Sequence, residues 1–207
     1  MQLRGEHLYF RYGAKKPYIL KDVSLKIESG ERLGLIAPSV YGKSTLAKIL
    51  AGYVRQEQGQ VLIDGKELSS GGYCPVQLIY QHPELAVNPR LRMKKTLTEA
   101  WCPDRELLDR MGIEQAWMTR WPYELSGGEL QRFCIARALS PETKFLICDE
   151  ISVMLDVITQ AQIWNVLMEI AEERNLGMLI ITHDLPLAER ICTNMIHLQE
   201  INHRDDS

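Results

Sequence analysis

Long apolar runs are missing from this chain of 207 residues. A membrane-spanning helix needs about 20 consecutive apolar residues, and no run in the sequence approaches that length. The N-terminal sequence MQLRGEHLYF has no apolar segment of the kind found in secretory leaders. We therefore expect neither a membrane span nor a signal peptide. The formal charge of −3 at pH 7 argues against a surface that coats nucleic acid.

Paired cysteines are missing as well. The five cysteines stand singly, without the spacing of a metal site, at Cys74, Cys102, Cys134, Cys148 and Cys192. Cys134 and Cys148 lie in apolar stretches, so we interpret them as small buried residues in a reducing cytoplasm. There is no internal repeat, low-complexity segment or linker, apart from a polar tail after about Asn202. The length predicts one well-buried core, with room for a small appended subdomain.

The stretch Leu33–Gly52, LGLIAPSVYGKSTLAKILAG, is the most informative part of the sequence. An apolar, strand-like run passes through a loop into a helix that Gly52 ends. The helix has one apolar face, formed by Leu46, Ile49 and Leu50. The tetrapeptide GKST at 42–45 suits a phosphate-binding loop. Backbone N–H groups at a helix N-terminus bind anions, the lysine reaches the β- and γ-phosphates, and the first hydroxyl ligates Mg²⁺.

This loop departs from the pattern G-x-x-x-x-G-K-[ST]. Ala37 stands at the first glycine, and Val40 stands where longer forms of the motif have another glycine. A valine is strained wherever the backbone needs a positive φ. If that strain arises only with bound nucleotide, it weakens ATP binding roughly 5- to 150-fold, and the nucleotide-free loop is open or collapsed. Taken alone, GKST also fits an ordinary helix start.

Alternating apolar residues predict β-strands on both sides of the loop. Residues 1–36 have this pattern, and a second alternating run ends at Asp64-Gly65, the signal of a tight hairpin. We therefore expect an antiparallel β layer beside the loop. Tyr12 could stack on a nucleotide base there, although a tyrosine beside a glycine also fits a plain strand end.

The β pattern disappears between about Pro83 and Leu139, after a short apolar strand at Val76–Tyr80. Pro103-Asp104 starts a helix in this region, and Gly112 stops it. We interpret three tryptophans as core residues of a small helical subdomain: Trp101, Trp117 and Trp121.

The stretch Leu125–Leu139, LSGGELQRFCIARAL, begins with a capping box. Ser126 and Glu129 have the S-x-x-E spacing that satisfies the first N–H groups of a helix. Capping boxes are common in ordinary helices. The two glycines at 127–128 are less ordinary, because they leave backbone N–H groups bare at a helix N-terminus. We interpret this arrangement as a second anion contact.

The last third of the chain alternates strands with helices. Phe145–Cys148 is a continuous apolar run typical of a buried parallel strand, and Asp149-Glu150 follows it directly. Two carboxylates at a strand end suit an aspartate on the Mg²⁺ side followed by a base for water. The later elements are expected as a helix at 157–175, a strand at 178–181, a helix near 186–192 and a strand near 195–198. The alternation predicts a parallel α/β sheet.

At LSGGELQR the sequence resembles the signature of the ATP-binding cassette family. The other motifs of that family stand around it in the family order: Tyr12, GKST at 42–45, Gln81, FLICDE at 145–150, Leu155-Asp156 and His183 in ITHD. The resemblance implies a P-loop NTPase of RecA-like α/β fold, with a parallel-sheet core, an antiparallel β subdomain and an inserted helical subdomain. It implies a single domain at 1–207, with the β subdomain and core at 1–82, the helical subdomain at about 83–140 and the rest of the core at 141–202.

The resemblance also implies roles for individual residues. Nucleotide would contact Tyr12, Pro38, Ser39, Val40, Tyr41, Gly42, Lys43, Ser44, Thr45 and Asp156. Mg²⁺ would lie near Ser44, Gln81 and Asp149, with Asp149 acting through water. Glu150 would polarise the attacking water, assisted by Gln81 and by His183 at the γ-phosphate. Ser126, Gly127 and Gly128 would face ATP bound by the other cassette of a head-to-tail dimer.

A narrower resemblance links QHPELAVNP at 81–89 and DVITQAQIW at 156–164 to the nickel, dipeptide and oligopeptide importers. It implies an ATPase on the cytoplasmic face of the cell membrane. The implied partners are a second cassette, transmembrane permease subunits and, indirectly, an extracytoplasmic substrate-binding protein, but no nucleic acid. The chain lacks the C-terminal extension of many members and has Ile151 where many have proline, so the substrate stays open among nickel, metal chelates and peptides.

Two other functions fit parts of the pattern. A degenerate cassette would bind nucleotide weakly and complete a paralogue's site, but Glu150 and His183 are both retained here. A cassette ATPase of DNA repair or translation would carry coiled-coil insertions or two cassettes, and the sequence has neither. The importer ATPase is therefore our main hypothesis.

Overall fold

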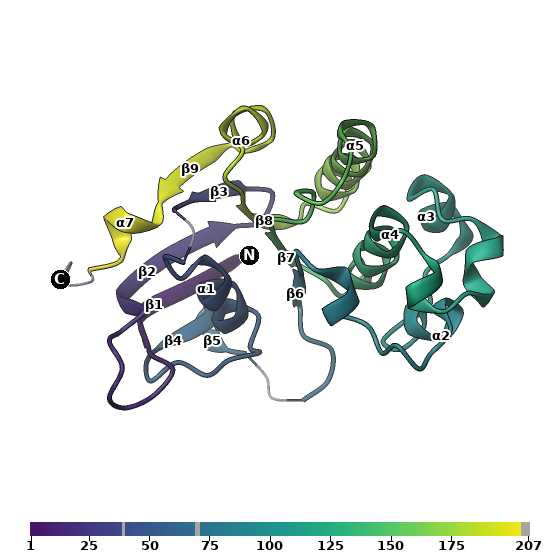
Figure 1. Ribbon diagram of the computed structural model, residues 1–207. Helices are drawn as coiled ribbons and strands as arrows, with labels where there is room; N and C mark the ends of the chain where they lie inside the picture. The colour runs from purple at the N-terminus through teal and green to yellow at the C-terminus, as the bar shows by residue number, and fades with distance from the viewer. Residues whose placement is uncertain (39, 69–70, 204–207) are drawn as a thin grey trace.

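The computed structural model describes residues 1–38, 40–68 and 71–203, which form two β-sheets and a set of flanking helices (Figure 1). The antiparallel sheet has the order β2-β1-β4-β5, formed by Leu20–Glu28, Gln2–Phe10, Gln58–Ile63 and Lys66–Glu67. The parallel sheet has the order β6-β7-β8-β3-β9, formed by Val76–Ile79, Phe145–Asp149, Gly177–Ile181, Arg32–Ile36 and Asn194–His197. The expected α/β architecture is confirmed.

The helices connect these strands. They are α1 (Lys43–Leu50), α2 (Met93–Leu97), α3 (Arg105–Arg110), α4 (Gly127–Ala138), α5 (Val157–Glu173), α6 (Leu185–Ile191) and α7 (Leu198–Ile201). Short 3-10 turns lie at Pro83–Leu85, Gln115–Thr119 and Pro122–Glu124. None of the helices within the described ranges is long and apolar enough to cross a bilayer.

The neighbouring strands β7 and β8 of the parallel sheet are buried on both faces. In β7, Phe145 and Ile147 contribute to a first apolar core, while Leu146 and Cys148 contribute to a second. This division follows from the two-residue period of a strand. It explains why 145–148 reads as a continuous apolar run in the sequence.

The first core joins the antiparallel sheet to α1 and one face of the parallel sheet. The helix buries the apolar face expected from the sequence, with Leu46 and Leu50 at 0% exposure. The expected hairpin also forms, because Asp64 and Gly65 both have positive φ between β4 and β5. The antiparallel layer therefore lies beside α1, as predicted.

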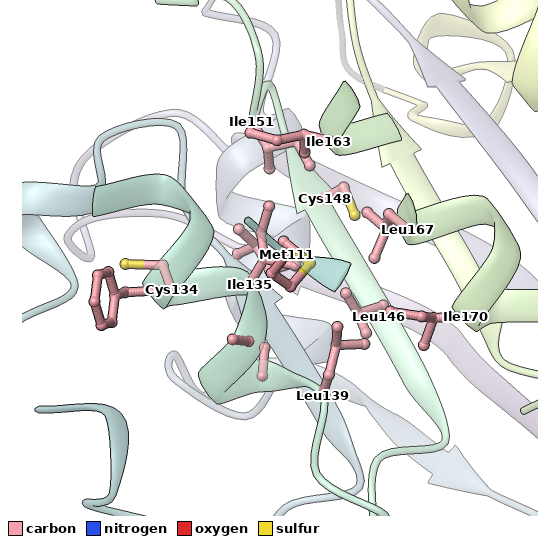
Figure 2. Close-up of a cluster of buried hydrophobic side chains, with 14 of the residues drawn as sticks. Met111, Cys134, Ile135, Leu139, Leu146, Cys148, Ile151, Ile163, Leu167 and Ile170 are labelled. Carbon is pink, nitrogen blue, oxygen red and sulfur yellow. The ribbon is translucent and has the colours of Figure 1, made fainter. Parts of the chain in front are cut away.

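The second core joins the other face of the parallel sheet to α4, α5 and the short helices around them. Figure 2 shows Leu146 and Cys148 of β7 among Ile135 of α4 and Leu167 and Ile170 of α5. The short helices lie at the opposite end of the molecule from α7 (Figure 1). The division of the chain into subdomains stays a prediction.

The interpretation of the three tryptophans as core residues is confirmed for Trp117, whereas Trp101 only packs against the second core and Trp121 is not part of it. Trp117 is buried, but Trp101 and Trp121 are only partly so. The indole N–H of Trp101 donates to the Arg137 carbonyl at 2.8 Å, and Arg92 lies 4.8 Å from the Trp121 ring centroid. Both rings therefore have polar partners at the protein surface, as amphipathic indoles often do.

Boundaries near the C-terminus also differ from the sequence expectation. The long helix ends at Glu173 rather than 175, within the usual uncertainty of helix ends. The short helix α7 was not predicted, because its few residues were attributed to the end of the preceding strand. Its buried Leu198 packs in the first core, so tertiary contacts rather than a local pattern select this turn.

Candidate functional site

The carboxyl ends of the parallel strands meet at one edge of the sheet. The glycine-containing loop follows β3, Gln81 follows β6, Glu150 follows β7 and His183 follows β8. Because β6, β7, β8 and β3 are neighbours in that order, residues far apart in sequence lie together. Open α/β sheets bind ligands at this edge.

A cavity of about 380 Å³ opens at this edge, beside the N-terminus of α1. Its lining includes expected nucleotide contacts, namely Tyr12, Val40, Gly42, Lys43, Ser44 and Thr45, together with Gln81 and Glu150 from the residues expected to perform hydrolysis. Pro38 and Tyr41, also expected to contact nucleotide, are not part of this lining. Ile19 also lines it and was missed, because a loop isoleucine carries no signal of its own in the sequence. Ser39 lies outside the described residues.

The loop backbone is left-handed at two of its residues. Gly42 has φ 103 and caps α1, and a Cβ there would lie 2.9 Å from Ile19 Cγ2. Val40 has φ 68, and its side chain is 96% exposed. A β-branched residue is strained in this region. The condition set from the sequence, a positive φ at Val40, is therefore met.

Lys43 is buried, and its ammonium group already has partners. Its Nζ donates to the Ala37 carbonyl at 2.7 Å and the Pro38 carbonyl at 3.1 Å. It also lies 3.7 Å from Glu150 Oε1. The lysine is thus held at the loop, and it lines the cavity. Among the described residues, only Glu150 has a carboxylate within 4 Å of its ammonium group.

The Glu150 carboxylate has three polar side chains around it, those of Lys43, Gln81 and His183. Gln81 Nε2 donates to Glu150 Oε2 at 3.2 Å, and His183 Nδ1 lies 3.6 Å from the same oxygen. The Glu150 backbone is left-handed, with φ 51, and its N–H donates to the Ile181 carbonyl at 3.0 Å. The fold thus brings together the residues expected to perform hydrolysis.

Asp149 is buried next to the loop, with an exposure of 6%. Burial raises the pKa of its carboxyl above the usual value, while a hydrogen bond with Ser44 acts in the opposite direction. A buried carboxylate and a hydroxyl suit Mg²⁺, which uses one or two carboxylates together with water and phosphate oxygens. The described residues hold no cluster of three or more His, Cys, Asp or Glu side chains that could bind a metal alone. This donor set fits a cation shared with a phosphate ligand.

Tyr12 lies at the outer edge of the cavity. Its hydroxyl is 3.2 Å from Thr45 Oγ1, and its ring meets Phe10 edge to face at 5.0 Å. Tyr12 is 57% exposed and lines the cavity, so its ring is accessible to a planar ligand.

Two groups of expected contact residues are not part of the cavity lining. Ser126 caps α4 in the predicted capping box, with Glu129 Oε2 accepting from the Ser126 N–H at 2.7 Å. Asp156 caps α5 by accepting from Ile158 and Thr159. Gly127 and Gly128 begin α4, and the space around a Cβ at Gly127 is open. Within this chain, these residues cap or begin the helices α4 and α5.

A second cavity of about 360 Å³ lies beside the segment that follows Gln81 in the chain. It is lined by residues that include Tyr80, Leu85, Ala86 and Arg137. Arg137 of α4 holds this segment, because its guanidinium donates to the Ala86 carbonyl at 2.5 Å. Leu85 is 77% exposed at the rim, so an apolar side chain is presented to solvent there.

The fold and the loop define a P-loop nucleotide-binding protein. The sequence profile of the ABC transporter family matches residues 20–153. The oligopeptide transport ATP-binding protein OppF of Haemophilus influenzae is 34% identical over 197 residues, which cover 86% of this chain and 59% of that protein. The nickel import ATP-binding protein NikE of Escherichia coli is also 34% identical, over 86% of this chain and 74% of that protein. This chain belongs to the ABC transporter family.

The chain spans only part of the length of several relatives. The chain spans 59% of OppF and 54% of a probable peptide transporter ATP-binding protein of Sinorhizobium fredii. It spans only 32% of the glutathione import ATP-binding protein GsiA of Pectobacterium atrosepticum, to which it is 35% identical.

Solved cassettes share the fold. A dimeric ATP-binding cassette in a post-hydrolysis state, bound to ADP and Pi, has a TM-score of 0.79, with 24% identity over 94% of this chain and 93% of that one. Clostridium perfringens cbiO1, part of the transporter complex cbiONQ, has a TM-score of 0.75, with 24% identity over 94% of this chain and 83% of that one.

Proposed function

We propose that this chain is the ATP-hydrolysing subunit of a membrane importer. The observation that carries the proposal is the arrangement of Lys43, Gln81 and His183 around the Glu150 carboxylate, at the edge of a cavity formed by the phosphate-binding loop. A binding-only cassette needs the loop but has no use for a positioned carboxylate. Glu150 is therefore assigned as the base that polarises water.

ATP enters this cavity with its base against Tyr12 and its phosphates at 40–45. Lys43 shifts its contacts from the Ala37 and Pro38 carbonyls to phosphate oxygens. Ser44, Gln81 and Asp149 would hold Mg²⁺, which supplies positive charge to the phosphates when bound. Hydrolysis then depends mainly on positioning and electrostatics around a loose phosphoryl transition state.

A second cassette completes the site. Gly127 and Gly128 begin α4 and do not line the cavity of their own chain, and a helix N-terminus favours an anion. We assign them to the γ-phosphate held by a partner cassette in a head-to-tail dimer. Asp156, at the exposed N-terminus of α5, faces the same partner.

The segment 81–93 is assigned to the contact with a permease. It passes from the Mg²⁺ side of the site to the short helices, along the cavity next to Tyr80 and Arg137. Exposed Leu85 at its rim suits an apolar side chain of a membrane-embedded partner. The chain would then lie on the cytoplasmic face of the cell membrane.

The importer would take up nickel, a metal chelate or a peptide-type substrate, delivered by an extracytoplasmic binding protein. Relatives named for nickel, oligopeptide and glutathione import support this range without selecting within it.

ATP turnover tests the proposal. Purified protein is assayed alone and together with the cassette encoded beside it, with Mg-ATP as substrate. We expect turnover that rises on mixing if the two cassettes pair. Absence of Mg-dependent turnover in both preparations, and in the assembled transporter, would contradict the proposed function.

A further inference from the structure

The loop at 150–156 joins two residues with proposed roles, Glu150 and Asp156. It leaves β7 with a left-handed backbone at Glu150, where φ is 51. Such a conformation is uncommon for a residue with a side chain and persists only where the surroundings hold it. The direction of the Glu150 carboxylate therefore depends on what fixes this loop.

The two ends of the loop are fixed by neighbouring elements. The Glu150 N–H donates to the Ile181 carbonyl of β8 at 3.0 Å. At the other end, Asp156 Oδ1 accepts from the Thr159 N–H at 3.0 Å and so caps α5. Between them, the Val153 N–H donates to the Glu150 carbonyl at 3.3 Å, while the residues Val153 and Met154 are 41% and 65% exposed, so their side chains add little packing.

The middle of the loop is held from α5. The indole N–H of Trp164 donates to Ser152 Oγ at 3.0 Å. Both residues are buried, with exposed fractions of 4% for Trp164 and 5% for Ser152. Ile151 is also buried and shares a core with Ile163, beside which it lies in Figure 2. Two adjacent residues of α5 thus hold two adjacent residues of the loop.

We propose that Trp164 is a positioning residue for ATP hydrolysis: through Ser152 it fixes the loop that directs the Glu150 carboxylate. This inference rests on the proposed function. An indole N–H can only donate, and its partner here is the hydroxyl two residues after Glu150. Loss of that N–H leaves a buried hydroxyl without its donor and removes the one side-chain hydrogen bond recorded between α5 and residues 150–155 of the described chain.

Amide hydrogen exchange, measured by mass spectrometry on nucleotide-free protein, tests the anchor itself. Trp164→Phe keeps the apolar ring and removes the N–H, so we expect faster exchange in the peptide covering 150–156. Trp101→Phe is the matched control, because it removes an indole N–H that donates to the Arg137 carbonyl instead. Equal exchange at 150–156 in the two variants would overturn the proposal.

Substitutions at Ser152 test the anchor independently, and they decide whether it exists if Trp164→Phe does not fold. Ser152→Ala should reproduce the faster exchange, and combining it with Trp164→Phe should add nothing, because both remove the same bond. Ser152→Thr keeps the hydroxyl and should exchange as slowly as the wild type. Wild-type exchange in Ser152→Ala would contradict the anchor.

Steady-state turnover tests whether the anchor positions Glu150. We expect Trp164→Phe to lower kcat roughly 2- to 10-fold, the equivalent of one hydrogen bond, while KM for ATP and the values for Trp101→Phe stay at wild type. Faster exchange with unchanged kcat would overturn the positioning role. Absence of wild-type turnover would instead contradict the proposed function, and the exchange comparison would still decide whether the anchor exists.

Discussion

Gln81 Nε2 donates to Glu150 Oε2 at 3.2 Å, joining the residue after β6 to the residue after β7. The amide both restrains the carboxylate and lies on the proposed Mg²⁺ side. We predict that Gln81→Ala lowers kcat for ATP roughly 2- to 10-fold, because Glu150 loses a hydrogen-bond donor. The dependence of turnover on Mg²⁺ concentration should shift to higher concentration. A wild-type kcat at every Mg²⁺ concentration would exclude both roles for Gln81.

Val40 adopts φ 68, a backbone conformation in which a β-branched residue is strained. We predict that Val40→Gly raises the thermal midpoint, because glycine adopts this conformation freely and a strained residue costs on the order of 1–3 kcal/mol. Val40→Ala is the control. It removes the β-branch but keeps a Cβ, so it should recover less of the stability.

The same substitution tests when the strain matters for ATP. If the left-handed backbone at Val40 is common to the free and the ATP-bound loop, Val40→Gly should change the Kd for ATP by less than roughly fivefold, the lower end of the range that corresponds to 1–3 kcal/mol. Calorimetric titration measures this. A much larger gain in affinity would show that the strain arises on binding, as the sequence alone suggested.

Asp149 gives a prediction about pH. Burial raises the pKa of Asp149, so the folded state holds this proton more tightly than the unfolded chain does. Its contribution to stability is therefore complete below the ordinary pKa of 3.8 and is lost as pH rises through the raised pKa. We predict that Asp149→Asn unfolds at a higher temperature than the wild type at pH 7, without Mg²⁺ or nucleotide.

The advantage of Asp149→Asn should disappear as the pH falls towards 3.8, where the wild-type carboxyl is protonated. Asp156→Asn serves as the control, because hydrogen bonds from Thr159 lower the pKa of Asp156 and removal of its charge gives no such gain. A melting temperature for Asp149→Asn at or below that of the wild type at pH 7 would show that burial of this charge is already compensated.

Leu85 and Tyr123 provide a matched pair for the permease contact. Both are 77% exposed, but only Leu85 lines the cavity next to Arg137. With a photoreactive residue at either position in the assembled transporter, we expect capture of a permease subunit from position 85 and not from position 123. If positions 84–92 never capture a permease subunit, this segment does not form the contact.

The strand-to-loop junctions of this site were predictable from the sequence because their signals are local. The GKST tetrapeptide, the capping box at Ser126 and the acidic pair after 145–148 each require only a few neighbouring residues. The contact between Gln81 and Glu150 spans 69 positions, and no periodicity indicates it. The family resemblance assigned both residues to one site, whereas their contact required the structure.

The incorrect expectations about the tryptophans also arose because local sequence patterns do not show which residues a side chain contacts. Trp101 and Trp121 were assigned to the core by residue type alone, yet their polar edges find partners at the surface. Trp164 was read only as part of a resembling segment, although its indole holds Ser152. Hydrophobic patterning places a tryptophan on a helix face but does not show where its N–H donates.

Phosphate release by Glu150→Gln, compared with the wild type at equal ATP occupancy, tests the central claim most directly. Glutamine keeps the size of the side chain and the contact with Gln81, but it cannot act as the base. We predict ATP binding close to that of the wild type and turnover lower by at least ~100-fold, as expected for a positioned base. Turnover near the wild-type rate in Glu150→Gln would contradict the assignment of hydrolysis to this site.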